Sequence, residues 1–75
     1  MTAVQERIDL SRRVVERWEA MGGPGGRLAT TLEMIRSELA ILSKMAGDHP
    51  DVAPEIRELS ARYGALANKL RMGLN

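Results

Sequence analysis

The sequence contains no cysteine, which excludes disulfide bonds and thiolate metal sites. It also lacks phenylalanine and has only Trp18 and Tyr63 as aromatic residues. The core must therefore consist mainly of aliphatic side chains, which favours helices packed on helices. The single histidine, His49, stands beside a proline in a turn, where exposure to solvent is expected. Because there is no cysteine and the single histidine lies in a turn, no nucleophilic constellation can be assembled, so we expect the chain not to be an enzyme.

Long apolar runs and an excess of one charge are missing as well. No apolar run approaches the roughly 20 residues that span a bilayer, and the first residues lack the pattern of a signal peptide. We therefore expect a cytoplasmic protein. The 11 basic and 10 acidic residues alternate along the chain and leave a net charge of +1, so the electrostatic footprint of a nucleic-acid-binding domain is not evident.

Glycine and proline divide the 75 residues into three segments of similar length. We expect one helical domain over residues 1–75, with helices at about 2–22, 27–46 and 52–72. A glycine hinge at 22–26, which could let the first helix swing or swap between chains, and a proline turn at 47–53 would connect them. This pattern predicts an all-α fold, either an up-down-up three-helix bundle or a helical hairpin with the first helix packed beside it, with coiled-coil-like apolar stripes.

The first segment opens with Thr2 and Gln5 at the spacing of a capping box, which predicts a helix start near Thr2. Apolar and small residues then recur at alternating spacings of four and three, the pattern of an amphipathic helix. This stripe consists of Val4, Ile8, Ser11, Val15, Trp18 and Gly22. Leu10, Val14 and Met21 widen it to one side.

The second segment carries the strongest periodic signal. Its stripe consists of Leu28, Leu32, Ile35, Leu39, Leu42 and Ala46. Gly47 follows and is expected to close the helix in the left-handed conformation. A further row formed by Met34, Ile41 and Met45 lies to one side of the stripe, so we expect this helix to contact two neighbours and to form the centre of the bundle.

In the third segment, Asp51 is expected to cap the helix and Pro54 to lie in its first turn. Its stripe consists of Val52, Ile56, Leu59, Tyr63, Leu66 and Leu70. Small residues such as Gly64 occupy much of the remaining surface, which suggests that a neighbouring backbone approaches closely there.

The row of Met34, Ile41 and Met45 has two interpretations of equal weight. Flexible thioethers suit adaptable binding surfaces, but the same residues also fill irregular cores. We treat the row, together with Leu10 and Met21, as a candidate partner interface. The leading hypothesis is a non-catalytic helical interaction module, which either self-associates or serves as a small subunit, adaptor or chaperone for a partner helix.

No cofactor or metal is expected, because no glutamate is followed by histidine at the spacing that bundle metal sites use. Glu38, near the apolar face of the second helix, is expected to pair with an arginine. A nucleic-acid-associated regulator is the main alternative and would use Arg12, Arg13 and Arg17. Glutamates share the face of these arginines, so a solvated surface with ion pairs is the simpler interpretation.

A second alternative comes from a resemblance. The segment from His49 and Pro50 to Pro54, followed by a helix that contains a tyrosine, resembles the turn of type III secretion needle subunits. The size and helical makeup of the chain are also similar to those of the small co-chaperones of such systems. This resemblance implies a small secretion-system co-chaperone or structural component.

Overall fold

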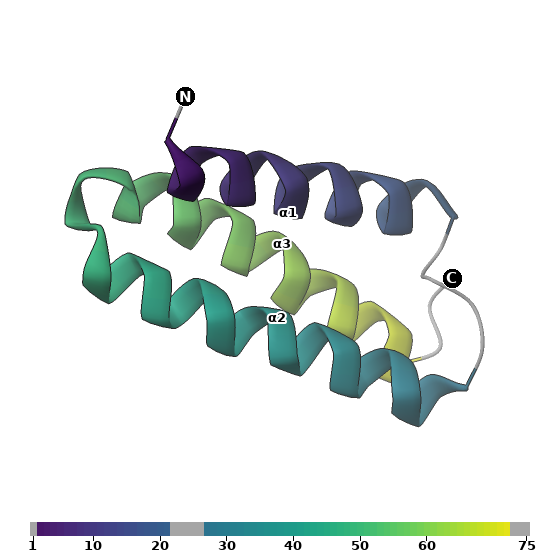
Figure 1. The fold of residues 1–75 in the computed structure, drawn as a ribbon. Coiled ribbons are helices and arrows are strands. Elements are labelled where there is room, and N and C mark those ends of the chain that lie inside the picture. The colour runs from purple at the N-terminus through teal and green to yellow at the C-terminus, as the bar shows by residue number, and fades with distance from the viewer. Residues whose placement is uncertain (1, 22–26, 73–75) are drawn as a thin grey trace.

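The computed structural model describes residues 2–21 and 27–72, which form three α-helices packed into a bundle. These are α1 (Ala3–Met21), α2 (Leu28–Asp48) and α3 (Ala53–Arg71), and a short 3-10 helix, η1 (Pro50–Val52), precedes α3. The helices run up, down and up, so α1 and α3 are parallel and α2 is antiparallel to both (Figure 1). The predicted all-α three-helix fold is confirmed, and the described residues contain no strand.

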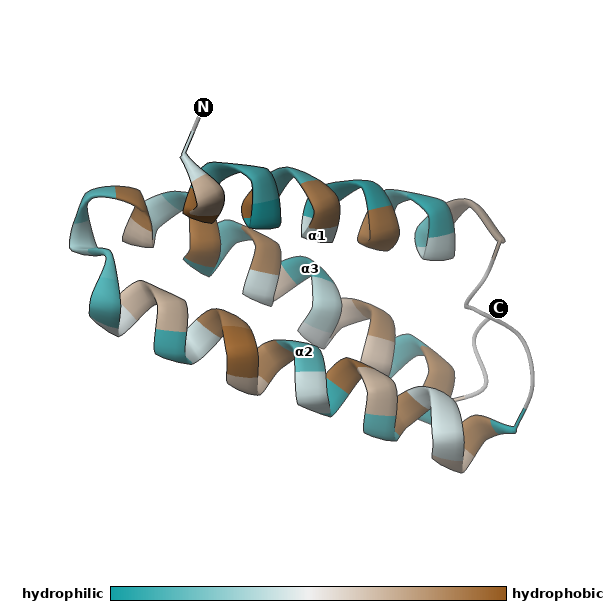
Figure 2. Cartoon of the chain, viewed as in Figure 1, coloured by the Kyte–Doolittle hydropathy of each residue, from teal (hydrophilic) through white to brown (hydrophobic). Residues whose placement is uncertain are grey.

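The core is built from the predicted stripes, because residues three and four apart fall on one side of a helix. Every helix contributes side chains that are almost completely buried: Ile8 and Val15 from α1, Ile35 and Leu42 from α2, and Ile56, Leu59, Tyr63 and Leu66 from α3. Figure 2 shows hydrophilic residues along the side of α1 that faces away from the other two helices. The periodicity of the sequence therefore identifies the buried side of each helix, although Leu28 of the predicted stripe is 48% exposed.

The central helix is α3 and not α2, so the prediction that the second helix forms the centre was wrong, although α2 does contact both other helices. α3 packs against both other helices and contributes five buried residues, compared with three each from α1 and α2. The physical reason is the exposure of Met34 and Ile41, which stay 45% and 44% exposed instead of packing against a third helix. The apolar surplus of α2 therefore lies at the surface of the bundle.

The start of α1 agrees in part with the predicted capping box. The Thr2 hydroxyl accepts a hydrogen bond from the backbone N–H of Gln5 over 3.2 Å, which satisfies one of the free donors of the first turn. The Gln5 side chain does not return to Thr2, however, and donates to Asp9 and Glu55 instead. Half of the predicted motif is therefore present.

Other helix ends differ from the predictions. Gly47 lies inside α2 without a left-handed backbone, and the helix continues to Asp48. It ends at His49, whose N–H donates to the Met45 carbonyl oxygen over 2.8 Å. Asp51 does not cap α3 either, because it belongs to η1 and α3 begins after Val52. The proline-containing turn thus replaces both expected caps.

Two further expectations concern glycines. A Cβ atom added to Gly64 would meet no atom of a neighbouring element within 4 Å, so the expected close approach of a backbone does not occur at this residue. The expected hinge at residues 22–26 lies outside the described residues. Within 2–21 and 27–72, none of the helices has a stretch long and apolar enough to cross a membrane.

Candidate functional site

A buried polar network joins the three helices near the middle of the bundle. The Ser11 hydroxyl on α1, which is completely buried, donates to Glu38 Oε1 of α2 over 2.8 Å. It also lies 3.2 Å from the hydroxyl of Tyr63 on α3. The Tyr63 hydroxyl in turn donates to the Ser11 carbonyl oxygen over 2.7 Å. Because a buried polar group without a partner is costly, this network favours one alignment of the three helices.

Glu38 completes the network at the surface. Its Oε2 atom accepts a hydrogen bond from Arg7 Nη2 over 2.8 Å, with the Glu38 side chain 16% exposed and that of Arg7 32% exposed. The prediction that Glu38 pairs with an arginine is confirmed. Ser11, by contrast, was predicted only as a small residue of the stripe. The position of the Ser11 hydroxyl in an apolar stripe was the available signal, because a buried hydroxyl requires a hydrogen-bond partner.

The two aromatic residues of the chain form a pair next to this network. The rings of Trp18 on α1 and Tyr63 on α3 meet edge to face, with centroids 6.1 Å apart and an interplanar angle of 87°. Burial raises the pKa of Tyr63 above its ordinary value, an effect that the hydrogen bond with Ser11 partly opposes and the nearby charge of Glu38 increases. Trp18 is only partly buried, and its other side faces a groove.

This groove lies between α1 and α2. Its lining consists of Arg7, Leu10, Val14 and Trp18 from α1 and Met34, Ser37 and Glu38 from α2, and we refer to it as the α1–α2 groove. It is open and has a volume of about 470 Å³. Leu10 and Met34 come from opposite helices and are 48% and 45% exposed. The structure therefore brings together two of the five residues that the sequence suggested as an interface.

The other three suggested residues lie outside the lining of this groove. Ile41 is 44% exposed one heptad after Met34, and Met21 is 61% exposed at the end of α1. Met45 is partly buried against the core instead. The methionine row therefore divides into an exposed part, Met34 and Ile41, and a core part, Met45.

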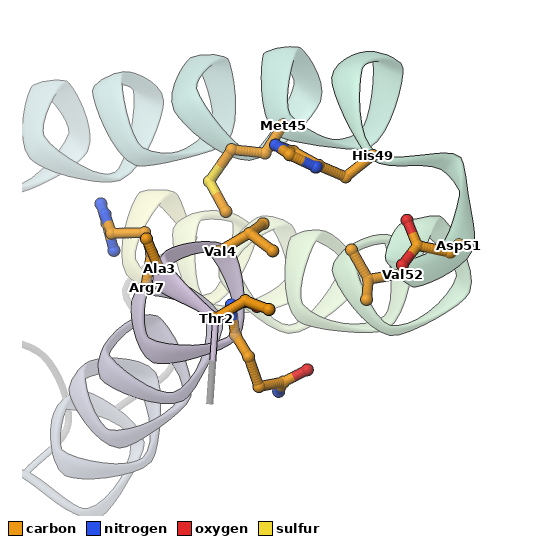
Figure 3. Close-up of a pocket in the computed structure, with 9 residues that line it drawn as sticks. Thr2, Ala3, Val4, Arg7, Met45, His49, Asp51 and Val52 are labelled. Carbon is orange, nitrogen blue, oxygen red and sulfur yellow. The ribbon is translucent and has the colours of Figure 1, made fainter.

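Met45 borders a second hollow at the end of the bundle that holds the start of α1 and the turn after α2. The lining comprises Thr2, Ala3, Val4, Gln5, Arg7, Met45, His49, Asp51 and Val52, around an open volume of about 790 Å³. Figure 3 shows the Met45 side chain directed from α2 toward Val4. His49 is exposed, as expected for a lone histidine in a turn.

The predicted arginine face is not a single patch. Arg12 pairs with Asp9 over 3.0 Å and with Glu55 of α3. The hydrogen bond to Glu55 is the main cause that raises the pKa of Arg12 above its ordinary value. Arg13 and Arg17 are exposed, and the described part of the chain offers neither of them an ion pair.

Glu16 and Glu19 of α1 were expected to pair with these arginines, but they pair with α3 instead. Arg62 of α3 lies 2.6 Å from Glu19 and 3.9 Å from Glu16. Together with the pair of Arg12 and Glu55, these contacts bind α1 to α3 along the side away from the groove. Across the α1–α2 side the described chain has a single ion pair, between Arg7 and Glu38.

Within residues 2–21 and 27–72, no three histidine, aspartate or glutamate side chains gather in a way that could hold a metal ion. Comparison with known proteins gives no match, whether with family profiles, curated proteins or solved structures.

Proposed function

We propose that this chain is a non-catalytic protein-interaction module and that the α1–α2 groove is its recognition surface. The observation that carries the proposal is the pair of half-exposed apolar side chains, Leu10 and Met34, on opposite sides of a groove that also contains Val14 and Trp18. Grooves between two helices with apolar walls accept the apolar side of a further helix. The expected binding partner is therefore a protein surface formed by the apolar side of a helix.

The chemistry of the groove supports this choice. A methionine and a leucine form its walls, and the flexible thioether of Met34 can adapt to a bound side chain. The only charges in the lining, Arg7 and Glu38, neutralise each other through their ion pair. An apolar helix would therefore cover little unpaired charge when it packs into the groove.

The single tryptophan provides a direct test, because Trp18 lines the groove. The full chain is titrated with a synthetic amphipathic helical peptide of leucine and lysine and, separately, with increasing concentrations of the chain itself. We expect the emission of Trp18 to shift to shorter wavelength in at least one of the two series, because packing in the groove removes water from the indole.

Two glutamate substitutions make the test specific. Met34→Glu places a charge in the groove and should abolish the shift. Met72→Glu is the matched control, since Met72 is 70% exposed and does not line the groove. An emission that stays constant in both series, or that responds equally in the two variants, would contradict the proposed function.

A further inference from the structure

The α1–α2 groove has charged ends of opposite sign. Because α1 and α2 are antiparallel, the start of α1 lies beside the end of α2 (Figure 1). Three exposed acidic residues, Glu6, Asp48 and Asp51, lie at that end, and two exposed arginines, Arg17 and Arg27, lie toward the other. Within the described chain, none of these five side chains takes part in an ion pair.

Neighbouring charges reduce this asymmetry without removing it. Lys44 lies near the acidic end and Glu33 near the basic end, so the acidic end keeps an excess of two negative charges and the basic end an excess of one positive charge. The clusters around Arg12 and Arg62 lie on the side of α1 that packs against α3. Each of these clusters contains one arginine and two carboxylates and therefore does not change the difference between the ends.

The apolar residues of the groove and the charges at its ends share one centre. On α2, Met34 and Ile41 are placed symmetrically about the point between residues 37 and 38, and so are Arg27 and Asp48.

On α1, Leu10 and Val14 are symmetric about residue 12, and Glu6 and Arg17 are symmetric about nearly the same point. The hydrogen bond between Ser11 and Glu38 shows that the two centres lie at the same level of the bundle.

We propose, building on the function proposed above, that the occupant of the groove is a second copy of this chain in antiparallel orientation. A two-fold axis that crosses the groove at right angles through this centre places α1 on the partner's α1 and α2 on the partner's α2. Each acidic end then faces a basic end. Met34 lies opposite the partner's Ile41, and Leu10 lies opposite the partner's Val14.

The charges select this arrangement over the other symmetric one. A two-fold axis along the groove would place acidic end on acidic end and basic end on basic end, which is unfavourable. In the antiparallel dimer, Glu6 faces the partner's Arg17, and Arg27 faces the partner's Asp48. The apolar contacts hold the dimer together, and the charges set its orientation.

The test exchanges charges between two variants. Glu6→Arg and Arg17→Glu are each expected to raise the dissociation constant of the dimer about tenfold, because each places two pairs of like charges across the interface. An equal mixture of the two variants should recover the original affinity as a heterodimer, since opposite charges then face each other again. Sedimentation velocity at low salt measures all three samples.

The mixture is decisive because Glu6 and Arg17 cannot pair within one chain. They are eleven residues apart on one helix, or about 16 Å at the rise of an α-helix. Arg57→Glu on α3 is the control, since Arg57 is exposed and forms no ion pair within the described chain. This change should leave the dissociation constant unchanged.

The possible results separate this inference from the proposed function. A chain that stays monomeric at every concentration, but whose Trp18 emission responds to the amphipathic peptide, retains the proposed function and overturns the dimer. A dimer that Met34→Glu dissociates, but that the mixed charge variants do not restore, overturns the antiparallel arrangement. A monomer with no response to the peptide overturns both.

Discussion

The hydroxyl of Tyr63 on α3 donates a hydrogen bond over 2.7 Å to the carbonyl oxygen of Ser11 on α1, inside the core of the bundle. Tyr63→Phe removes this bond and keeps the ring, including its contact with Trp18. We expect the free energy of unfolding to fall by about 1 kcal/mol, the usual net contribution of one hydrogen bond. Urea denaturation followed by circular dichroism measures the change. An unchanged stability would mean that the hydroxyl gains nothing from its buried position.

The same hydroxyl makes stability depend on pH in the alkaline range. The pKa of Tyr63 is raised in the folded chain, mainly by burial, whereas the unfolded chain titrates near the ordinary value of 10.0. Below that value both states keep the proton and Tyr63 contributes no pH dependence. Above it the unfolded state loses its proton first, so the free energy of unfolding decreases as pH rises toward the folded pKa.

Denaturation between neutral and strongly alkaline pH tests this dependence, with Tyr63→Phe as the control. Lysines titrate in the same range in both proteins, so the difference between the two curves isolates the tyrosine. We expect the decline to be steeper in the chain with Tyr63. Parallel curves would show that the tyrosine ionises equally easily in both states.

Glu38 has two roles that different substitutions can separate. Glu38→Gln keeps an acceptor for Ser11 and loses the charge that attracts Arg7, so we expect a loss of about 0.5 to 1 kcal/mol, as for a partly exposed ion pair. Glu38→Leu removes the hydrogen bonds to both Ser11 and Arg7. It should lower the free energy of unfolding by about 1 to 3 kcal/mol, because the buried Ser11 hydroxyl loses its acceptor. Thermal denaturation of the two variants measures the difference. Equal losses would assign the effect of Glu38 to its charge alone.

Gly64 is a position where the chain can be stabilised. It lies inside α3, and an added Cβ atom would meet nothing within 4 Å. Gly64→Ala should therefore raise the free energy of unfolding by about 0.5 to 1 kcal/mol, because alanine loses less backbone freedom in a helix. Gly47→Ala, near the end of α2, should gain less. A loss of stability in Gly64→Ala would show that the space beside α3 is occupied in solution.

The helices should differ in how readily they open. α2 and α3 pack against each other more extensively than α1 packs against α3. We therefore expect the amide hydrogens of Ile8 and Val15 on α1 to exchange sooner than those of Ile35 and Leu59, which hydrogen exchange followed by NMR can measure. Equal exchange rates for the four amides would show that the bundle opens only as a whole.

The sequence predicted the buried side of each helix because periodicity records burial directly. Ile8, Ile35 and Leu59 all belong to predicted stripes and are buried. The sequence could not show which helix is central, because an apolar residue such as Met34 gives the same periodic pattern whether it packs in a core or faces solvent. The difference depends on where a third helix lies, which is a property of the assembled bundle.

Local signals at helix ends were less informative for a related reason. Gly47 and Asp51 are residue types that often cap helices. Here, however, α2 continues past Gly47, and Asp51 belongs to the 3-10 turn that begins at Pro50. The candidate site was predictable in part. Leu10 and Met34 were recognised as surplus apolar residues, whereas the groove between them follows from the relative position of α1 and α2, which no pattern within one helix specifies.

The edge-to-face pair of Trp18 and Tyr63 has an optical consequence. With ring centroids 6.1 Å apart, we expect the tyrosine to transfer excitation energy to the tryptophan. The chain has one residue of each kind, so light absorbed by Tyr63 is emitted by Trp18 only while α1 lies against α3. The excitation spectrum of the unlabelled chain therefore reports the docking of its first helix.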